Sequence, residues 1–310
     1  MEKKFSGVVV PMITPFTKQF QVDTNAVVNI AEHLINHNTH PFVLGTTGES
    51  VSISKQERLK LVKATVAATA GRKTVYAGIS GNCFSEVIEE AKAFADLGVN
   101  AFVSTMPCYY PVDPDQMLRY FEALADAVSL PLIIYNIPST THLSIPLAIA
   151  DKLSYHDNIM GFKDSEKGID RVVNAIALWK NRPDFSYLLG WALMSQKAMA
   201  LGADGIVPST GNLSPGLYQT IFEAGKAGNE KLALNAQIKA DFISEIYQKD
   251  KILSRSLPVL KTMMSAFQLC ETTVLPPLHP LEHQQAESVV NEVLMTFGNL
   301  NSINNIENES

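Results

Sequence analysis

The feature that most constrains this chain is the regular alternation of short apolar runs with stretches of helical periodicity. Each apolar run, often rich in β-branched residues, precedes a stretch in which apolar side chains recur every three or four positions. The predicted strands cover residues 6–13, 42–44, 74–77, 101–104, 131–135, 158–165, 185–189 and 203–207. Such alternation places parallel strands side by side under covering helices, so it predicts an α/β fold.

The number of strand–helix units distinguishes a closed barrel from an open sheet. Eight units within residues 1–227 fit a (β/α)8 TIM barrel, which typically takes about 250 residues. An open doubly wound sheet would be expected to carry a GxGxxG fingerprint after its first strand. The corresponding segment here, residues 11–16 (PMITPF), contains no glycine. We therefore predict a closed barrel over residues 1–227.

The pattern changes after the eighth unit. Helical periodicity continues through residues 231–249, 258–269 and 280–297, with no further strand-like run. We interpret residues 228–298 as a C-terminal helical extension that packs on the barrel. Residues 299–310 are rich in asparagine and serine and are predicted to form a disordered tail.

Composition excludes several classes of function. A net charge of -6 argues against nucleic acid, which requires a concentrated basic face. No window approaches the roughly 18 unbroken apolar residues of a membrane span, and the N-terminal sequence lacks the apolar core of a signal peptide. The 3 cysteines are widely spaced and odd in number, which fits neither a disulfide framework nor a metal site. We expect a cytoplasmic protein that binds neither membrane nor nucleic acid.

In a TIM barrel, the residues at the carboxyl ends of the strands share one site. Lys163 ends a buried run, where a lysine most often extends its ammonium group to water. Held among apolar neighbours, however, its amine would have a lowered pKa and could form a Schiff base with a ketone. Tyrosines could transfer protons, and hydroxyl groups could hold a carboxylate. The other strand ends supply Thr14, Thr46, Thr47, Tyr109, Tyr110, Tyr135, Gly190 and Ser209.

Three motifs coincide with these strand ends: residues 45–50 (GTTGES), 135–138 (YNIP) and 161–165 (GFKDS). In this order and spacing they resemble the dihydrodipicolinate synthase / N-acetylneuraminate lyase family of pyruvate-dependent class I aldolases. The resemblance runs from residue 7 to about residue 281. It implies a TIM barrel that needs no cofactor and no metal, takes pyruvate and an aldehyde, and assembles as a homotetramer made of two dimers.

The resemblance also implies roles for individual residues. Lys163 resembles the Schiff-base lysine of the family, and Tyr135 resembles its general acid and base. Thr46 corresponds to the middle member of a tyrosine–threonine–tyrosine proton relay. Thr47 corresponds to the residue that grips the pyruvate carboxylate through its hydroxyl and backbone N–H. Tyr110 corresponds to the relay tyrosine that a neighbouring subunit inserts.

The resemblance to the family implies two further assignments. Tyr109 is the alternative candidate for the inserted tyrosine, because the loop that carries both tyrosines differs slightly from the family pattern. The Val207 carbonyl corresponds to a position that contacts the pyruvate part of the substrate.

The positions expected to bind the second substrate depart from both named activities. Thr140 stands where the synthases have a carboxylate-binding arginine, and a threonine cannot offer a bidentate fork. Gly190 is followed by Trp191 and Ala192, where sialic acid lyases carry an acidic pair. Ser165 and Ser209 match positions that contact sugar-derived substrates.

We therefore predict a Schiff-base lyase that cleaves, condenses or dehydrates a 2-keto-3-deoxy sugar acid or a related 2-keto acid. The alternatives are a dihydrodipicolinate synthase, which joins pyruvate to aspartate semialdehyde, and a non-catalytic member that binds a keto acid. A phosphate-binding barrel is a lesser alternative, because no lysine or arginine accompanies residues 209–212 (STGN). A metal site at His33 and His37 is not predicted, since a third ligand is missing from the pattern.

Overall fold

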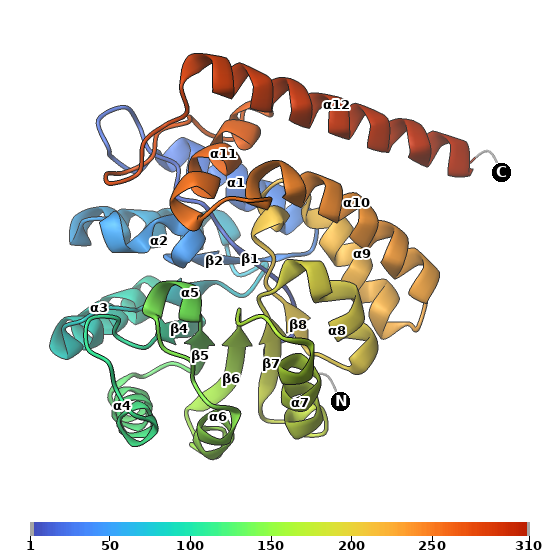
Figure 1. The fold of residues 1–310 in the computed structure, drawn as a ribbon. Helices are drawn as coiled ribbons and strands as arrows, with labels where there is room; N and C mark the ends of the chain where they lie inside the picture. Colours follow the sequence, from blue (N-terminus) through green and yellow to red (C-terminus); the bar gives the residue numbers. More distant parts are fainter. Residues whose placement is uncertain (1–2, 309–310) are drawn as a thin grey trace.

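The computed structural model describes residues 3–308 of the chain. Its eight parallel strands pair in sequence order and close into a barrel, because β8 pairs with β1 through Gly205 and Gly7 (Figure 1). The predicted TIM barrel is therefore confirmed. The strands are β1 Gly7–Pro11, β2 His40–Val43, β3 Tyr76–Gly78, β4 Ala101–Thr105, β5 Leu132–Asn136, β6 Ile159–Asp164, β7 Ser186–Leu189 and β8 Gly205–Ile206.

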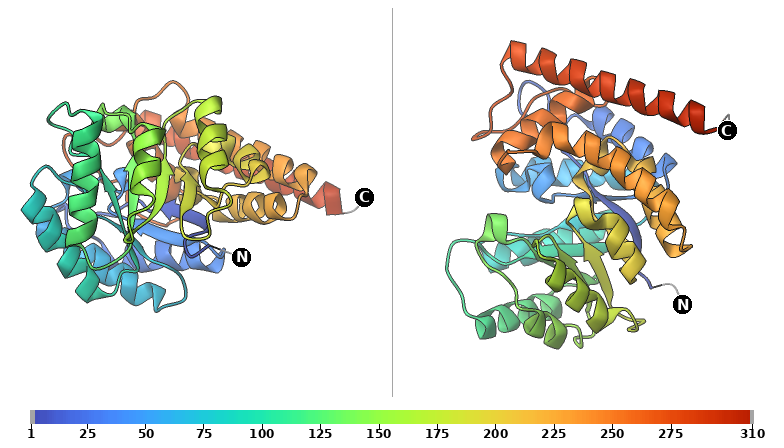
Figure 2. Two further views of the ribbon diagram at one scale, coloured as in Figure 1. Left: turned by 90° about the horizontal axis from the view of Figure 1, so that it is seen from below. Right: turned by 45° about the vertical axis from the view of Figure 1, so that its right-hand side comes forward.

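Helices surround the barrel on its outside, as Figure 2 shows from below and from the side. Local chemistry sets where several of them begin. The Asp23 carboxylate accepts hydrogen bonds from the first backbone N–H groups of α1. Asp113 and Gln116 form a capping box at the start of α4, where Pro114 occupies the first turn. The helices are α1 Thr24–Asn36, α2 Lys55–Thr69, α3 Phe84–Leu97, α4 Pro114–Ala127, α5 Pro138–Thr141, α6 Leu147–Leu153, α7 Ile169–Trp179, α8 Ser195–Leu201 and α9 Pro215–Lys226.

Side chains alternate between the barrel interior and the layer between strands and helices. In β5, Ile133 and Tyr135 belong to the interior apolar cluster, whereas Leu132 and Ile134 belong to the outer cluster. Phe162 of β6 also packs in the outer cluster. This alternation turns the next residue, Lys163, toward the interior and directs Asp164 outward.

The extension consists of α10 Glu230–Gln248, α11 Leu253–Ser265 and α12 His283–Asn308. It lies on the side toward which the strand arrows point, with α12 along its outer surface (Figure 1). The helical periodicity predicted for residues 258–269 differs from α11, which begins earlier and contains Pro258.

The last residues differ from the predicted disordered tail. The backbone of α12 continues through Asn308, and residues 309–310 lie outside the described residues. Extending a formed helix adds one hydrogen bond per residue without a new nucleus, so a polar segment can continue an existing helix.

Candidate active site

Lys163 is buried in the barrel interior near the end of β6, with only 4% of its surface exposed. Its Nζ atom lies 3.5 Å from the ring centroid of Tyr135 and 4.8 Å from that of Phe42. Burial lowers the pKa of the Lys163 ammonium, and the Tyr135 hydroxyl opposes this effect in part. A lowered pKa gives a larger fraction of neutral amine near neutral pH, which is the form that attacks a ketone.

Tyr135 pairs with Lys163 in the register of β5 and β6, so the two predicted catalytic side chains are neighbours. Ser165, which follows β6, donates a hydrogen bond of 3.5 Å to the Tyr135 hydroxyl. Gly190 completes this group, because a Cβ atom there would lie 2.0 Å from the Ser165 Oγ. The structure therefore brings four of the predicted residues together.

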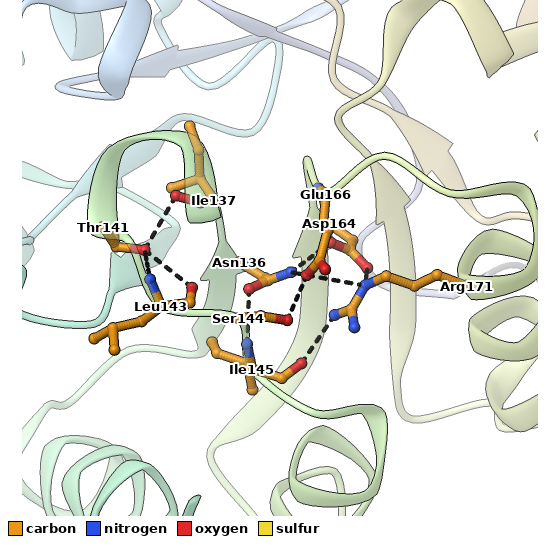
Figure 3. A network of polar contacts seen from close by, with 9 residues as sticks. All are labelled: Asn136, Ile137, Thr141, Leu143, Ser144, Ile145, Asp164, Glu166 and Arg171. Carbon is orange, nitrogen blue, oxygen red and sulfur yellow. Dashed lines mark hydrogen bonds and ion pairs between the residues drawn. The ribbon is translucent and has the colours of Figure 1, made fainter. Parts of the chain in front are cut away.

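Figure 3 shows a polar network that joins Asn136, Asp164 and Arg171 to neighbouring loop residues. Asp164 is fully buried, and its carboxylate accepts hydrogen bonds from Arg171 Nε at 2.7 Å and Asn136 Nδ2 at 2.8 Å. The Asn136 amide also donates to Glu166 at 2.9 Å, and Arg171 donates to the Ile145 carbonyl at 2.9 Å. These bonds link the residues that directly follow Tyr135 and Lys163.

Sequence reasoning missed this network, although one signal for it was present. An aspartate inside a buried strand requires partners, because a buried unpaired carboxylate is strongly unfavourable. Burial raises the pKa of Asp164, and Arg171 and Asn136 oppose that effect.

The loop after β2 carries Thr46 and Thr47 in a short 3-10 helix, η1 Thr46–Gly48. Thr47 is buried, and the Gly48 carbonyl accepts a hydrogen bond of 2.7 Å from Thr14 Oγ1. Glu49 ends η1 in a left-handed conformation with φ of 57°. The loop is thus fixed directly after its two threonines.

Glu49 is held by the C-terminal extension. Its Oε1 atom lies 2.5 Å from Lys261 Nζ of α11, and its Oε2 accepts a hydrogen bond of 2.7 Å from the Leu275 N–H. Lys261 also donates to the Thr273 carbonyl at 2.7 Å. Burial lowers the pKa of Lys261, and Glu49 opposes that effect.

A cavity of about 370 Å³ opens at the carboxyl ends of the strands, within the usual size range of small-molecule sites. Phe42 and Tyr135, whose rings flank the Lys163 amine, line it. The other lining residues are Leu44, Gly45, Thr46, Glu49, Ser50, Val51, Ser52, Gly78, Ser80, Gly81, Asn82, Val103, Thr105, Met106, Pro107, Cys108, Thr140, Thr141, Leu253, Ser254, Leu257, Pro277 and Leu278.

Ser209 does not line this cavity. Its hydroxyl lies 2.7 Å from the Tyr247 hydroxyl and accepts a hydrogen bond of 3.2 Å from Gln248, both on α10. Val207 belongs to the same interior cluster as Tyr135 and is 3% exposed. Ser209 therefore hydrogen-bonds the barrel to the extension and does not face the cavity.

Tyr109 and Tyr110 lie on the surface of the chain, in the segment between β4 and α4. They are 75% and 71% exposed, and their rings contact each other edge to face with centroids 5.0 Å apart. Neither tyrosine lines the cavity, although the preceding residues Pro107 and Cys108 do.

His33 and His37, for which no metal site was predicted, lie at the carboxyl end of α1. The His33 and His37 rings contact each other edge to face, and His37 Nδ1 lies 2.8 Å from the His33 carbonyl. Over residues 3–308, no three His, Cys, Asp or Glu side chains gather as they would around a metal ion.

A closed parallel barrel that gathers a buried lysine, a tyrosine and a threonine loop around a cavity has the architecture of a TIM-barrel enzyme. A family model described as the dihydrodipicolinate synthetase family matches residues 4–295. The chain therefore belongs to the dihydrodipicolinate synthetase family, which confirms the resemblance drawn from the three motifs.

Individual relatives agree with this assignment. The chain is 30% identical over 269 residues to an uncharacterized DapA-like lyase of Thermofilum pendens, covering 86% of this chain and 89% of the relative. It is 32% identical over 232 residues to a 4-hydroxy-tetrahydrodipicolinate synthase of Oceanobacillus iheyensis, covering 74% and 78%.

Solved structures give the same result. The dihydrodipicolinate synthase of Bacteroides thetaiotaomicron has a TM-score of 0.89 at 30% identity, covering 95% of this chain and 99% of that one. YagE of E. coli K12, a member of the dihydrodipicolinic acid synthase family solved in complex with pyruvate, has a TM-score of 0.88 at 26% identity, with 94% and 99% covered.

Proposed function

We propose that this protein is a Schiff-base lyase, a class I aldolase acting on pyruvate or another 2-keto acid, with Lys163 as the nucleophile. The observation that carries the proposal is the burial of the Lys163 amine 3.5 Å from the ring centroid of Tyr135, a residue that lines the cavity. Membership of the family supports it, as does the pyruvate bound to YagE.

The reaction begins when the neutral Lys163 amine attacks the keto carbon. The resulting carbinolamine loses water and becomes a protonated imine, which withdraws electrons from the neighbouring carbon–carbon bond. Cleavage of the bond between C3 and C4 leaves an enamine and releases an aldehyde, and condensation is the reverse. A proton then adds to C3 of the enamine to give the pyruvate imine, and water hydrolyses this imine, which releases pyruvate and frees the amine. Tyr135 transfers the protons, and Thr46 connects it to the relay.

The remaining roles concern binding and assembly. Thr47 and the Val207 carbonyl are assigned to the pyruvate part, with Ser165 and Gly190 beside Tyr135. Tyr110, or Tyr109 in its place, would complete the relay from a neighbouring subunit of a homotetramer. The high exposure of both tyrosines supports such an insertion, since an exposed aromatic pair is available for burial by a partner.

The substrate class proposed is a 2-keto-3-deoxy sugar acid or a related 2-keto acid. Thr140 and Thr141 line the cavity, and neither carries the charge of the arginine that a synthase would need there. Dihydrodipicolinate synthase activity is the alternative favoured by the names of several relatives.

In the part of the chain that the structure describes, no helix combines the length and apolar character needed to cross a membrane. We place the protein in the cytoplasm.

The proposal is tested by reducing the imine with borohydride in the presence of pyruvate and measuring the mass of the protein. We expect one reduced pyruvate adduct, mapped by peptide analysis to Lys163 and absent from Lys163→Ala. Lys261 is an internal control, because it is equally buried but paired with Glu49. Reversible pyruvate binding without an adduct would instead support the non-catalytic keto-acid-binding alternative.

A further inference from the structure

We propose that the second substrate is an uncharged aldehyde whose distal part is a hydrocarbon, an inference that rests on the imine chemistry proposed above. The first observation is the charge of the cavity wall. Among the described residues that line it, Glu49 is the one Asp, Glu, Lys or Arg side chain. Its carboxylate is already neutralised by Lys261 at 2.5 Å and hydrogen-bonded by the Leu275 N–H at 2.7 Å. A charged distal group would lose its hydration without gaining a counter-charge.

The second observation is the apolar surface at the mouth of the cavity. Leu253 of α11 and Val51, in the 3-10 helix η2 Ser50–Ser52, are 39% and 93% exposed, although both line the cavity. Leu257 and Leu278 add further apolar surface from the extension. Because the extension and the β2 loop offer hydrocarbon on both sides of the opening, a hydrocarbon chain bound there would be removed from water.

The third observation is that polar groups of the wall are used within the protein. Thr140 and Thr141 both donate their hydroxyl protons to the Ile137 carbonyl, at 3.3 and 3.1 Å. Ser80 Oγ accepts from the Thr105 N–H at 3.0 Å, and Asn82 Oδ1 accepts from the Cys108 N–H at 3.2 Å. Each of these four groups already makes a hydrogen bond within the protein, so it has fewer bonds left for a polyhydroxylated chain. Of the two kinds of substrate proposed above, the three observations favour a 2-keto acid with an apolar end over a sugar acid.

In the condensing direction, the enamine formed from pyruvate and Lys163 attacks the aldehyde carbon through C3. One carbon–carbon bond forms, and the aldehyde oxygen takes up a proton to become a hydroxyl. The water released on forming the imine is consumed again on its hydrolysis. The product is a 4-hydroxy-2-keto acid that contains all the atoms of pyruvate and the aldehyde.

The test compares acceptors after borohydride trapping has established the pyruvate adduct in the full-length protein. Pyruvate consumption is measured with butanal and benzaldehyde, with glyceraldehyde and with aspartate semialdehyde. We expect kcat/KM for at least one hydrocarbon aldehyde to exceed those for the other two classes by tenfold or more. An adduct combined with equal or better use of glyceraldehyde or aspartate semialdehyde overturns this inference alone. Failure to trap any adduct overturns the proposed function and the inference with it.

A pair of matched variants tests the role of the wall directly. Leu253→Arg places a cation at the cavity mouth and should raise the KM for the hydrocarbon aldehyde about tenfold. Leu294→Arg on α12 is the control, because Leu294 is 46% exposed and does not line the cavity. An unchanged KM in Leu253→Arg, or an equal rise in both variants, would contradict a hydrocarbon-binding mouth.

Discussion

Glu49 and Lys261 form a buried ion pair between the barrel and its C-terminal extension, with Oε1 and Nζ 2.5 Å apart and each side chain 1% exposed. Glu49 ends the short helix that holds Thr46 and Thr47, and Lys261 lies in α11. The pair thus connects the extension to the loop proposed to bind the pyruvate carboxylate. Because both groups are buried, neither tolerates loss of the other.

Removing one member of this pair should destabilise the protein strongly. Lys261→Met leaves the Glu49 carboxylate buried without its cation, and we expect the free energy of unfolding in urea to fall by about 3–5 kcal/mol. The double variant Glu49→Gln/Lys261→Met should recover a substantial part of that loss, because no uncompensated charge remains. A double variant as unstable as Lys261→Met would show that the lost contacts, and not the unpaired charge, cause the effect.

Replacing Lys163, the proposed nucleophile, should abolish the proposed activity and stabilise the fold. Lys163 is a polar group buried among the rings of Phe42 and Tyr135, so Lys163→Met should raise the free energy of unfolding by about 1–3 kcal/mol at pH 7. Pyruvate trapping should disappear in the same variant. A variant that is less stable than the natural protein would contradict a free-energy cost of burying this amine.

The pH dependence of the natural protein follows from the lowered pKa of Lys163. Between the folded pKa and the unfolded value of about 10.4, the unfolded state binds more protons, so this group makes stability rise with pH. The trapping rate should likewise rise with pH and level off below about pH 10.4. Stopped-flow trapping and urea unfolding at several pH values measure both, and Lys163→Met should lose this contribution to the slope.

Breaking the polar network around Asp164 should lower the stability of the protein. Arg171→Met removes the cation 2.7 Å from this fully buried carboxylate, and we expect a loss of about 3–5 kcal/mol in stability. Lys55→Met is the control, because Lys55 and its partner Glu89 are 64% and 66% exposed, and their ion pair should contribute about 0–1 kcal/mol. Equal losses in urea unfolding would argue against a special requirement at Asp164.

Gly190 should resist even the smallest side chain. A Cβ atom there would lie 2.0 Å from Ser165 Oγ, so Gly190→Ala must displace the serine that donates to the Tyr135 hydroxyl. We expect the rate of pyruvate trapping to fall about tenfold or more, the effect of about 1.4 kcal/mol on the barrier. Gly298→Ala, where a Cβ atom would meet nothing within 4 Å, should leave the rate unchanged.

Much of the fold could be predicted from the sequence because its signals are local. The caps at Asp23 and Asp113 and the apolar runs of the strands depend only on nearby residues. Lys163 and Tyr135 could be placed together because each ends a strand, and a barrel brings strand ends to one site. The four-residue helix α5 was missed, since so short a segment shows no periodicity.

The rest of the site depends on contacts between distant segments. Glu49 and Lys261 are ordinary charged residues in the sequence, and only the packing of α11 makes them partners. Ser209 follows a strand as predicted, yet Tyr247 and Gln248 on α10 take up its hydroxyl. Nothing in the local sequence specifies either arrangement.

The position of Lys261 late in the chain has a consequence for biosynthesis. A nascent chain that has completed all eight strands already contains Lys163, Tyr135 and the threonine loop. It still lacks α11, which supplies the cation for Glu49 and the leucines at the cavity mouth. The cavity is therefore completed only after α11, which follows all eight strands along the chain, has been synthesised and has packed on the barrel.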